Sequence, residues 1–152
     1  MNKTAVENSI NNSSDICNEA LRQENKIVAE YNYVLRKFSA ENLVDELLPI
    51  RNEHRKSIGD LGQLIMKIGG IPDQIPVTDI PISASLGGVE KLFGKSSAVE
   101  ILKNHEVMLL EEYEARLDCR ILVGDCVNIF ATILLPRVQS HLAKIGKLEE
   151  IA

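Results

Sequence analysis

The chain has 152 residues, of which 45% are hydrophobic and 26% charged, and its formal net charge is −5. This length and composition predict one soluble globular domain with a substantial core, which the absence of tryptophan makes mostly aliphatic. The negative charge argues against nucleic-acid partners and anionic membrane surfaces, and no apolar run is long enough to span a membrane. The polar start lacks the apolar segment of a signal peptide, so we expect a cytoplasmic location.

Four long helices are predicted from apolar residues spaced by threes and fours. Their expected ranges, in chain order, are 14–38, 41–68, 97–122 and 126–149. The first helix has an alternative start at Thr4, where the spacing to Glu7 matches a capping box. Gly69-Gly70 ends the second helix, and the proline-rich connection that follows holds at most one short helix, near 86–93.

The two halves of the chain repeat each other. His54 and His141 lie 87 positions apart, and each follows a Leu-Leu-Pro triplet and precedes an Ile-Gly pair. Upstream, an offset of 82 relates a second set of matching residues. In this set Glu24 and Tyr31 correspond to Glu106 and Tyr113. The repeat therefore predicts an internal duplication of one helical hairpin that carries Glu and Tyr on its first helix and His on its second.

Connection lengths predict how the hairpins are joined. Short turns join the two helices within each of the hairpins 14–69 and 97–149, so the helices of each hairpin should be antiparallel. The crossover 70–96 is long enough to run back along the full length of a helix of about 40 Å. Within each hairpin, Glu and His are equidistant from the turn and should lie level with each other. We therefore expect a single domain, 1–152, in which two carboxylates, two imidazoles and two phenols converge in one layer.

These residues resemble the pattern of the ferritin-like superfamily, which includes ferritins, bacterioferritins and rubrerythrins. The chain is most similar to small bacterial ferritin-like proteins, and the resemblance covers nearly all of it. It implies an all-α, ferritin-like antiparallel four-helix bundle with one long crossover. It also implies a role for six residues at a central metal site. Glu24, His54, Glu106 and His141 would be the ligands, and Tyr31 and Tyr113 would lie beside them.

One departure from that family bears on the kind of metal site. Di-iron members carry a Glu three residues before each His, but this chain has Arg51 and Val138 there. Without bridging carboxylates, a single ion held by two Glu and two His is the better expectation, with iron, or alternatively zinc or manganese, as the metal. Arg51 would add positive charge nearby. Glu53 would approach only if Pro49 distorts its helix.

Two functional hypotheses stay open at this stage. The first is a metal-binding, rubrerythrin-like protein, with oxidase or peroxidase-like chemistry at iron as one possibility. The second is a metal-free structural or stress-associated bundle, in which Glu and His form a buried polar network and the protein acts through its surface or by oligomerisation. A homodimer is expected in either case. His105 is predicted at the surface, and Cys17, Cys119 and Cys126 are expected to be reduced thiols.

Overall fold

The structure is a computed structural model that describes residues 3–39, 42–74 and 94–151. The described residues form only helices and their connections. The helices are α1 (Lys3–Lys37), α2 (Leu43–Lys67), α4 (Lys95–Asp118), α5 (Asp125–Ile129), the π-helical η3 (Phe130–Leu134) and α6 (Leu135–Ile151). The short helix expected near 86–93 lies outside the described residues. Within the described part of the chain, no helix is both long and apolar enough to cross a membrane.

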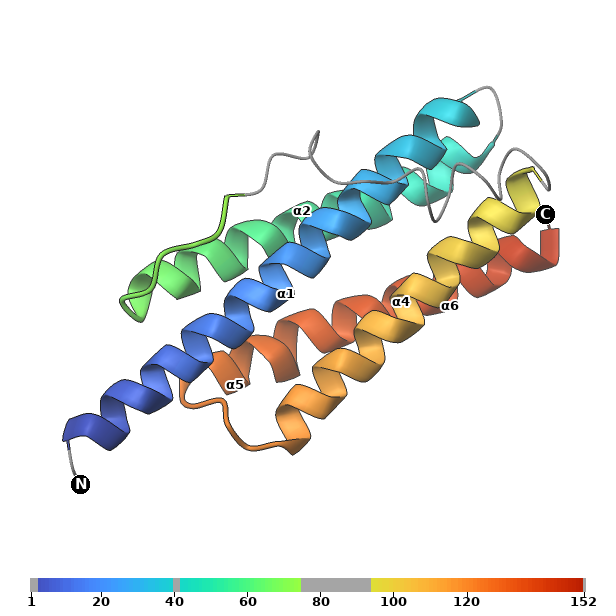
Figure 1. The fold of residues 1–152 in the computed structure, drawn as a ribbon. Helices are drawn as coiled ribbons and strands as arrows, with labels where there is room; N and C mark the ends of the chain where they lie inside the picture. The colour runs from blue at the N-terminus through green and yellow to red at the C-terminus, as the bar shows by residue number, and fades with distance from the viewer. Residues whose placement is uncertain (1–2, 40–41, 75–93, 152) are drawn as a thin grey trace.

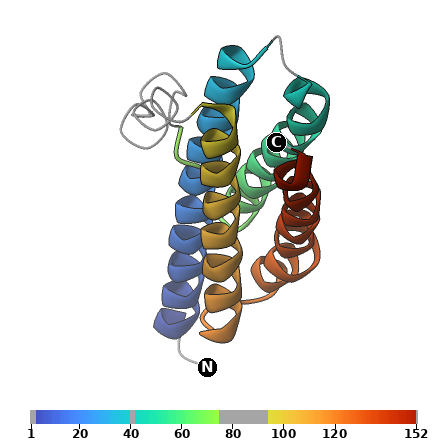
Figure 2. The ribbon, with the colours of Figure 1, turned by 90° about the vertical axis from the view of Figure 1, so that its right-hand side faces the viewer.

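The helices pack as a four-helix bundle made of two hairpins (Figure 1). Helix α1 packs against α2, and α4 packs against α6. Across the hairpins, α1 lies beside α4 and α2 beside α6, as Figure 2 shows. Helices α2 and α4 begin at the same end of the bundle and run in the same direction (Figure 1). The all-α bundle predicted from apolar spacing is therefore confirmed.

The core between the helices is aliphatic, as the composition predicts. Its fully buried side chains include Leu47, Ile50, Leu61 and Ile65 of α2, Val99 and Leu102 of α4, and Ile145 of α6. Burying one Leu or Ile side chain stabilises a fold by about 1.5–3 kcal/mol. This surrounding apolar shell fixes the inward faces of the helices, and the same faces carry the Glu, His and Tyr of the repeat.

Helix α1 begins at Lys3, so the predicted start at Ser14 is wrong and the alternative start near Thr4 is the better one. Further along the helix, Asn18 is held by the chain that follows α2. Asn18 Nδ2 donates to the carbonyl of Ile71 at 3.0 Å, and Asn18 Oδ1 accepts from the backbone N–H of Asp73 at 2.8 Å. These tertiary hydrogen bonds tie α1 to the chain that follows α2.

The end of α2 is the glycine stop predicted from Gly69-Gly70. Gly69 has φ 88, a conformation that glycine adopts without steric cost. The N–H groups of Gly69 and Gly70 donate to the carbonyls of Met66 and Ile65 at 3.1 and 2.8 Å. This is a Schellman motif, which satisfies carbonyls that the helix end would otherwise leave unpaired.

Gly70 also allows a close approach between this turn and α1. A Cβ added at Gly70 would lie 3.0 Å from Ile65 Cγ2 and 3.1 Å from Ser14 Cβ, in addition to meeting the Ser14 hydroxyl. We expect Gly70→Ala to lower the free energy of unfolding by about 1–3 kcal/mol.

The matched control for this change is Gly62→Ala, inside α2, where an added Cβ meets nothing within 4 Å. That variant should gain about 0.5–1 kcal/mol, because alanine loses less backbone entropy in a helix. Urea denaturation of both variants measures the two changes. Equal effects of the same sign would contradict the close packing of Gly70 on Ser14.

The second hairpin turns at residues 119–124. Helix α4 ends at Asp118 rather than at the predicted 122, because Arg120 takes φ 55 and Gly124 φ 53, both left-handed. The expected break at Gly124 is confirmed.

The last helical run is distorted directly before Pro136. Residues 130–134 form a π-helical turn directly before Leu135 and Pro136, and the N–H of Leu135 donates to the carbonyl of Phe130. A proline supplies no N–H to the carbonyl four residues earlier, so the preceding turn relaxes into a wider one. Helix α2 remains α-helical through Pro49, so the same sequence signal has no matching break there.

Candidate metal centre

Six side chains from the repeat meet in one buried layer at the middle of the bundle. Their exposed fractions are 0% for Glu24, Tyr31, Glu106, Tyr113 and His141, and 1% for His54. A buried carboxylate or imidazolium is costly unless it is paired and hydrogen-bonded. The contacts within this layer therefore determine whether the arrangement is stable and what it can bind.

The tyrosines connect the two hairpins by a reciprocal exchange. The Tyr31 hydroxyl donates to Glu106 Oε1 at 2.7 Å, and the Tyr113 hydroxyl donates to Glu24 Oε1 at 2.5 Å. Each phenol thus bonds the glutamate of the other hairpin. Burial, followed by the charge of the bonded glutamate, raises the pKa of both phenols well above the ordinary value. Both tyrosines therefore act as neutral hydrogen-bond donors.

His54 lies between the two glutamates. Its Nδ1 is 2.5 Å from Glu24 Oε2, and its Nε2 is 2.5 Å from Glu106 Oε1. Burial alone lowers the pKa of His54, but the Glu24 and Glu106 carboxylates outweigh it and raise that pKa to about 10. At neutral pH and without a metal, His54 is therefore an imidazolium that donates to both carboxylates.

His141 is placed differently from His54, although the repeat makes them equivalent. Its Nε2 is 3.1 Å from Glu53 Oε2, and its Nδ1 is 3.4 Å from Glu106 Oε2. His141 Nδ1 and Glu106 Oε2 are buried and make no hydrogen bond. The two imidazole rings are close together, with centroids 4.5 Å apart. Unsatisfied polar atoms are rare in protein interiors, so this facing pair requires an explanation.

Glu106 is the point on which the whole layer converges. Tyr31 and His54 approach one of its oxygens, and His141 faces the other. Burial raises the pKa of Glu106, but the charge of His54 and the contacts with both histidines prevail and lower it to about 2. Glu106 is therefore a carboxylate anion at any physiological pH.

Three of the four predicted ligands form a compact donor group. Among the described residues, ligand atoms of His54, Glu106 and His141 all lie within 4.8 Å of one another, and Glu24 is outside this group. Imidazole nitrogens and carboxylate oxygens suit Zn²⁺ and Fe²⁺. The orphaned pair on His141 and Glu106 is what a cation would satisfy, so the residues present fit a metal ion.

Of the residues predicted to lie near the site, Arg51 points away from it and Glu53 reaches it. Arg51 directs its guanidinium to Asn32 Oδ1, at 2.9 Å, and to Asn52 Oδ1, so the expected positive charge is not added to the cluster. Glu53 does reach the site, through His141, without any break in α2. The reason is that Glu53 lies on the face of α2 toward α6, where Lys144 Nζ is also 3.8 Å from its carboxylate.

A second histidine–glutamate pair lies outside the central layer. His105 Nδ1 contacts Glu30 Oε2, where Glu30 is buried and the His105 side chain is 23% exposed. The prediction that His105 lies at the surface is therefore wrong in part. Glu30 belongs to the repeat pattern but matches Glu112, so the repeat gave no signal that it would pair with a histidine.

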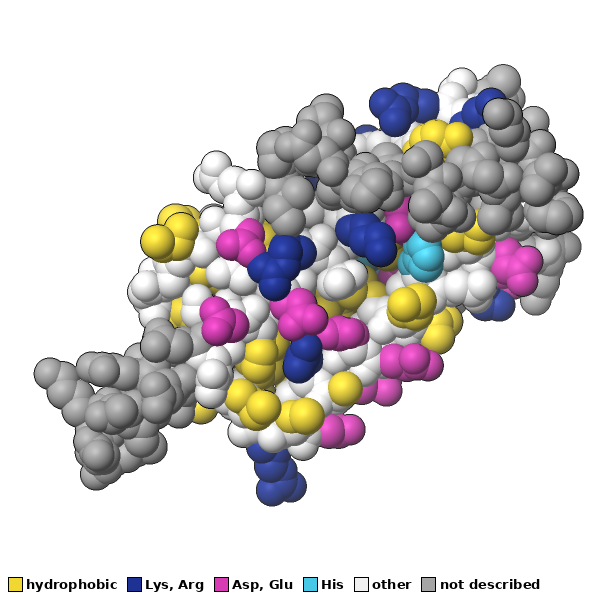
Figure 3. Space-filling model, viewed as in Figure 1, with side chains coloured by type: hydrophobic (Ala, Val, Ile, Leu, Met, Phe, Trp, Pro, Cys, Tyr) yellow, Lys and Arg dark blue, Asp and Glu magenta, His cyan; other side chains and the backbone are white. Residues whose placement is uncertain are grey.

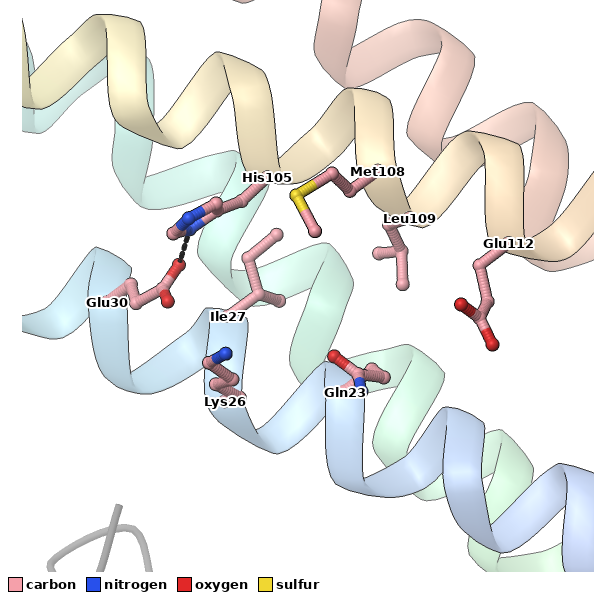
Figure 4. A pocket seen from close by; sticks show the side chains of 8 residues that line it. All are labelled: Gln23, Lys26, Ile27, Glu30, His105, Met108, Leu109 and Glu112. Carbon is pink, nitrogen blue, oxygen red and sulfur yellow. Dashed lines mark hydrogen bonds and ion pairs between the residues drawn. The ribbon is translucent and has the colours of Figure 1, made fainter. Parts of the chain in front are cut away.

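This pair borders a surface pocket between α1 and α4. Figure 4 shows Glu30 and His105 joined at one side of the pocket, with Ile27 and Leu109 between the two helices. The pocket volume is about 150 Å³. On the face of the molecule that Figure 3 shows, acidic, basic and apolar side chains are interspersed, and neither sign of charge dominates.

Comparison of the chain with known protein families, curated proteins and solved structures finds no match. What the structure establishes is thus an all-α four-helix bundle with a buried His/Glu group able to hold a metal ion.

Proposed function

We propose that this protein binds one divalent transition-metal ion, with iron(II) the expected metal, through His54, Glu106 and His141 inside a ferritin-like bundle. The observation that carries this proposal is the buried pair Glu106 Oε2 and His141 Nδ1, which face each other at 3.4 Å without a hydrogen bond. A cation bound there would satisfy both atoms.

The orientation of the two imidazoles supports the same conclusion. His54 Nδ1 and His141 Nε2 face the outer carboxylates of Glu24 and Glu53. The opposite nitrogens, His54 Nε2 and His141 Nδ1, both face Glu106. Metal-bound histidines usually donate their second nitrogen to a carboxylate, which fixes the ring and increases its basicity. Glu24 and Glu53 are therefore proposed as positioning residues, although the sequence had suggested Glu24 as a ligand.

The arrangement of the helices and the set of ligand side chains together favour a mononuclear metal centre. The two hairpins, with α2 and α4 running in the same direction, match the one-crossover topology of ferritin-like bundles. Arg51 points away and Val138 is apolar, so neither supplies the bridging carboxylate that a di-iron centre needs. Two histidines and one carboxylate are the ligands of many non-haem iron(II) centres and of some zinc sites.

The surrounding residues would determine the water access, the ligand positions and the proton release of such a metal centre. Aliphatic side chains exclude bulk water from the layer, and Tyr31 and Tyr113 hold Glu106 and Glu24 in place by donated hydrogen bonds. Loading an ion at His54 Nε2 requires that nitrogen to give up the proton that it donates to Glu106 Oε1, while Nδ1 keeps the proton that it donates to Glu24. Iron bound in this way supplies one-electron and oxygen chemistry.

The alternative is a metal-free bundle in which the layer is structural. One observation favours it: His54, as an imidazolium, satisfies a carboxylate oxygen at each nitrogen without any ion. In that case the protein would act through its surface or as an oligomer, and the homodimer expected from the sequence would be the functional form.

Metal analysis of the full chain, purified without a histidine tag or chelator, separates these two functions. We expect about one ion per chain after anaerobic incubation with Fe(II), and a matching count with Zn(II) in a parallel sample. Two ions per chain would contradict the mononuclear centre. Less than about a tenth of an ion per chain in all samples would refute metal binding and support the structural alternative.

A further inference from the structure

Of the three histidines in the chain, His105 is the one that lies outside the central layer. It borders the pocket between α1 and α4 that Figure 4 shows, which has a volume of about 150 Å³. The His105 side chain is 23% exposed, so a small solute in the pocket reaches the imidazole ring. The central layer makes no use of this ring, which leaves its role to be explained.

A buried carboxylate holds the His105 ring in one orientation. His105 Nδ1 contacts Glu30 Oε2, and the Glu30 side chain is 2% exposed. A carboxylate accepts hydrogen bonds and does not donate them, so in the neutral ring Nδ1 carries the proton and Nε2 keeps its lone pair. Metal-binding histidines are usually held in the same way, by a carboxylate on the second nitrogen. The pair therefore prepares His105 Nε2 to bind a metal ion.

A second metal-binding atom lies one helical turn further along α4. Met108 follows His105 by three residues and lines the same pocket, where it is 64% exposed. Side chains three residues apart on a helix are neighbours, with about 5–6 Å between their Cβ atoms. In Figure 4 the Met108 sulfur is directed toward the His105 side of the pocket. The unbranched methionine side chain adjusts its position easily, so the sulfur and the imidazole are able to bind one ion.

The rest of the pocket is compatible with a small, weakly hydrated cation. Its charged lining has the carboxylates of Glu30 and Glu112 against the ammonium of Lys26, so the pocket does not repel positive charge. The buried side chains of Ile27 and Leu109 lie between the two helices and give the pocket an apolar floor.

We propose that His105 and Met108 form a second metal site, which binds monovalent copper, Cu(I), with Glu30 as the positioning residue. A thioether is a soft ligand that selects Cu(I), and imidazole also suits copper. The site uses none of the three ligands of the proposed metal centre. The two proposals therefore stand or fall independently.

NMR of the full chain, isotopically labelled at the methionine methyl groups, tests this proposal. Cu(I) is added without oxygen and with ascorbate, which keeps the copper reduced. We expect the methyl signal of Met108 to shift, whereas that of Met66, which is 60% exposed on α2, should stay in place. Zn(II) in a parallel sample should leave both signals unchanged, because a thioether is a poor zinc ligand. An unmoved Met108 signal with Cu(I), or equal shifts of the two signals, would overturn the proposal.

Two matched variants count the copper that this site holds. Met108→Leu keeps an apolar side chain of similar size at an exposed position, so the fold should be unchanged while bound copper falls by about one ion per chain. Met66→Leu, the control, should bind as much copper as the unchanged protein. Copper held by cysteines or by the central layer is the same in both variants, so the difference between them measures this site alone. Equal copper in the two variants would refute the site and leave Glu30 and His105 as a structural ion pair.

Discussion

Replacing Glu106 by glutamine is expected to abolish metal binding, with a loss of affinity of at least about 100-fold. Glu106 is the only carboxylate in the donor group of His54, Glu106 and His141 found among the described residues. Glutamine keeps the size of the side chain but removes the charge that faces both histidines. Calorimetric titration of the full chain with Zn(II), and anaerobically with Fe(II), measures the change.

Control variants test whether the loss of metal affinity depends on where the replaced carboxylate lies. Glu24→Gln and Glu53→Gln should lose about 10–100-fold in affinity, because these residues orient the histidines from outside. Glu111→Gln, at an exposed position on the same helix as Glu106, should bind metal as the unchanged protein does. If Glu24→Gln were as damaging as Glu106→Gln, Glu24 would be a ligand, as the sequence had suggested.

Replacing His54 by glutamine is expected to destabilise the metal-free protein by about 3–5 kcal/mol at pH 7. The change leaves the buried carboxylates of Glu24 and Glu106 without the cation that now lies between them. Glu24 would keep the hydrogen bond from Tyr113, and Glu106 would keep the one from Tyr31 together with the 3.4 Å contact with His141. Urea denaturation in the presence of a chelator measures the loss.

The matched control for His54→Gln is Arg116→Gln, which also removes one cation from between two carboxylates. Arg116 bonds Glu19 and Glu112 on the surface, where all three side chains are at least 30% exposed. Water screens these charges, so this variant should lose about 0–1 kcal/mol. Comparable losses in the two variants would mean that burial does not strengthen the central pairing.

The pH dependence of stability gives an independent check on His54. Its pKa is raised from 6.5 to about 10, so its contribution is fully present below pH 6.5 and is lost as the pH rises through 10. The pKa of Glu106 is lowered from 4.5 to about 2, so its contribution is present above pH 4.5 and is lost as the pH falls through 2. His54→Gln should remove the alkaline decline. A decline that survives the substitution would assign it to other groups.

Much of the architecture follows from local patterns. Apolar spacing predicts the four helices, the Gly69-Gly70 stop follows from backbone conformation, and Pro136 marks the wider turn at residues 130–134. The start of α1 was misplaced because residues 3–13 are mostly polar and carry no continuous apolar stripe. Farther along α1, Asn18 is held by hydrogen bonds to Ile71 and Asp73 of the chain after α2, which no local pattern indicates.

For the site, the repeat correctly brought Glu24, Tyr31, His54, Glu106, Tyr113 and His141 into one layer. It also implied that the two halves are equivalent, and the structure departs from that symmetry. His54 contacts both glutamates of the layer, whereas His141 contacts Glu53 and leaves Nδ1 facing Glu106.

The sequence by itself determined which faces of the helices point inward, because helical periodicity is a property of each segment alone. Only the tertiary structure decided which side chains meet across the hairpins. The tyrosine exchange, the contact between Glu53 and His141 and the pair of Glu30 with His105 all lie between elements distant in the chain. Such contacts depend on the rotation and axial offset of one hairpin against the other, which packing of the whole core sets and no local pattern encodes.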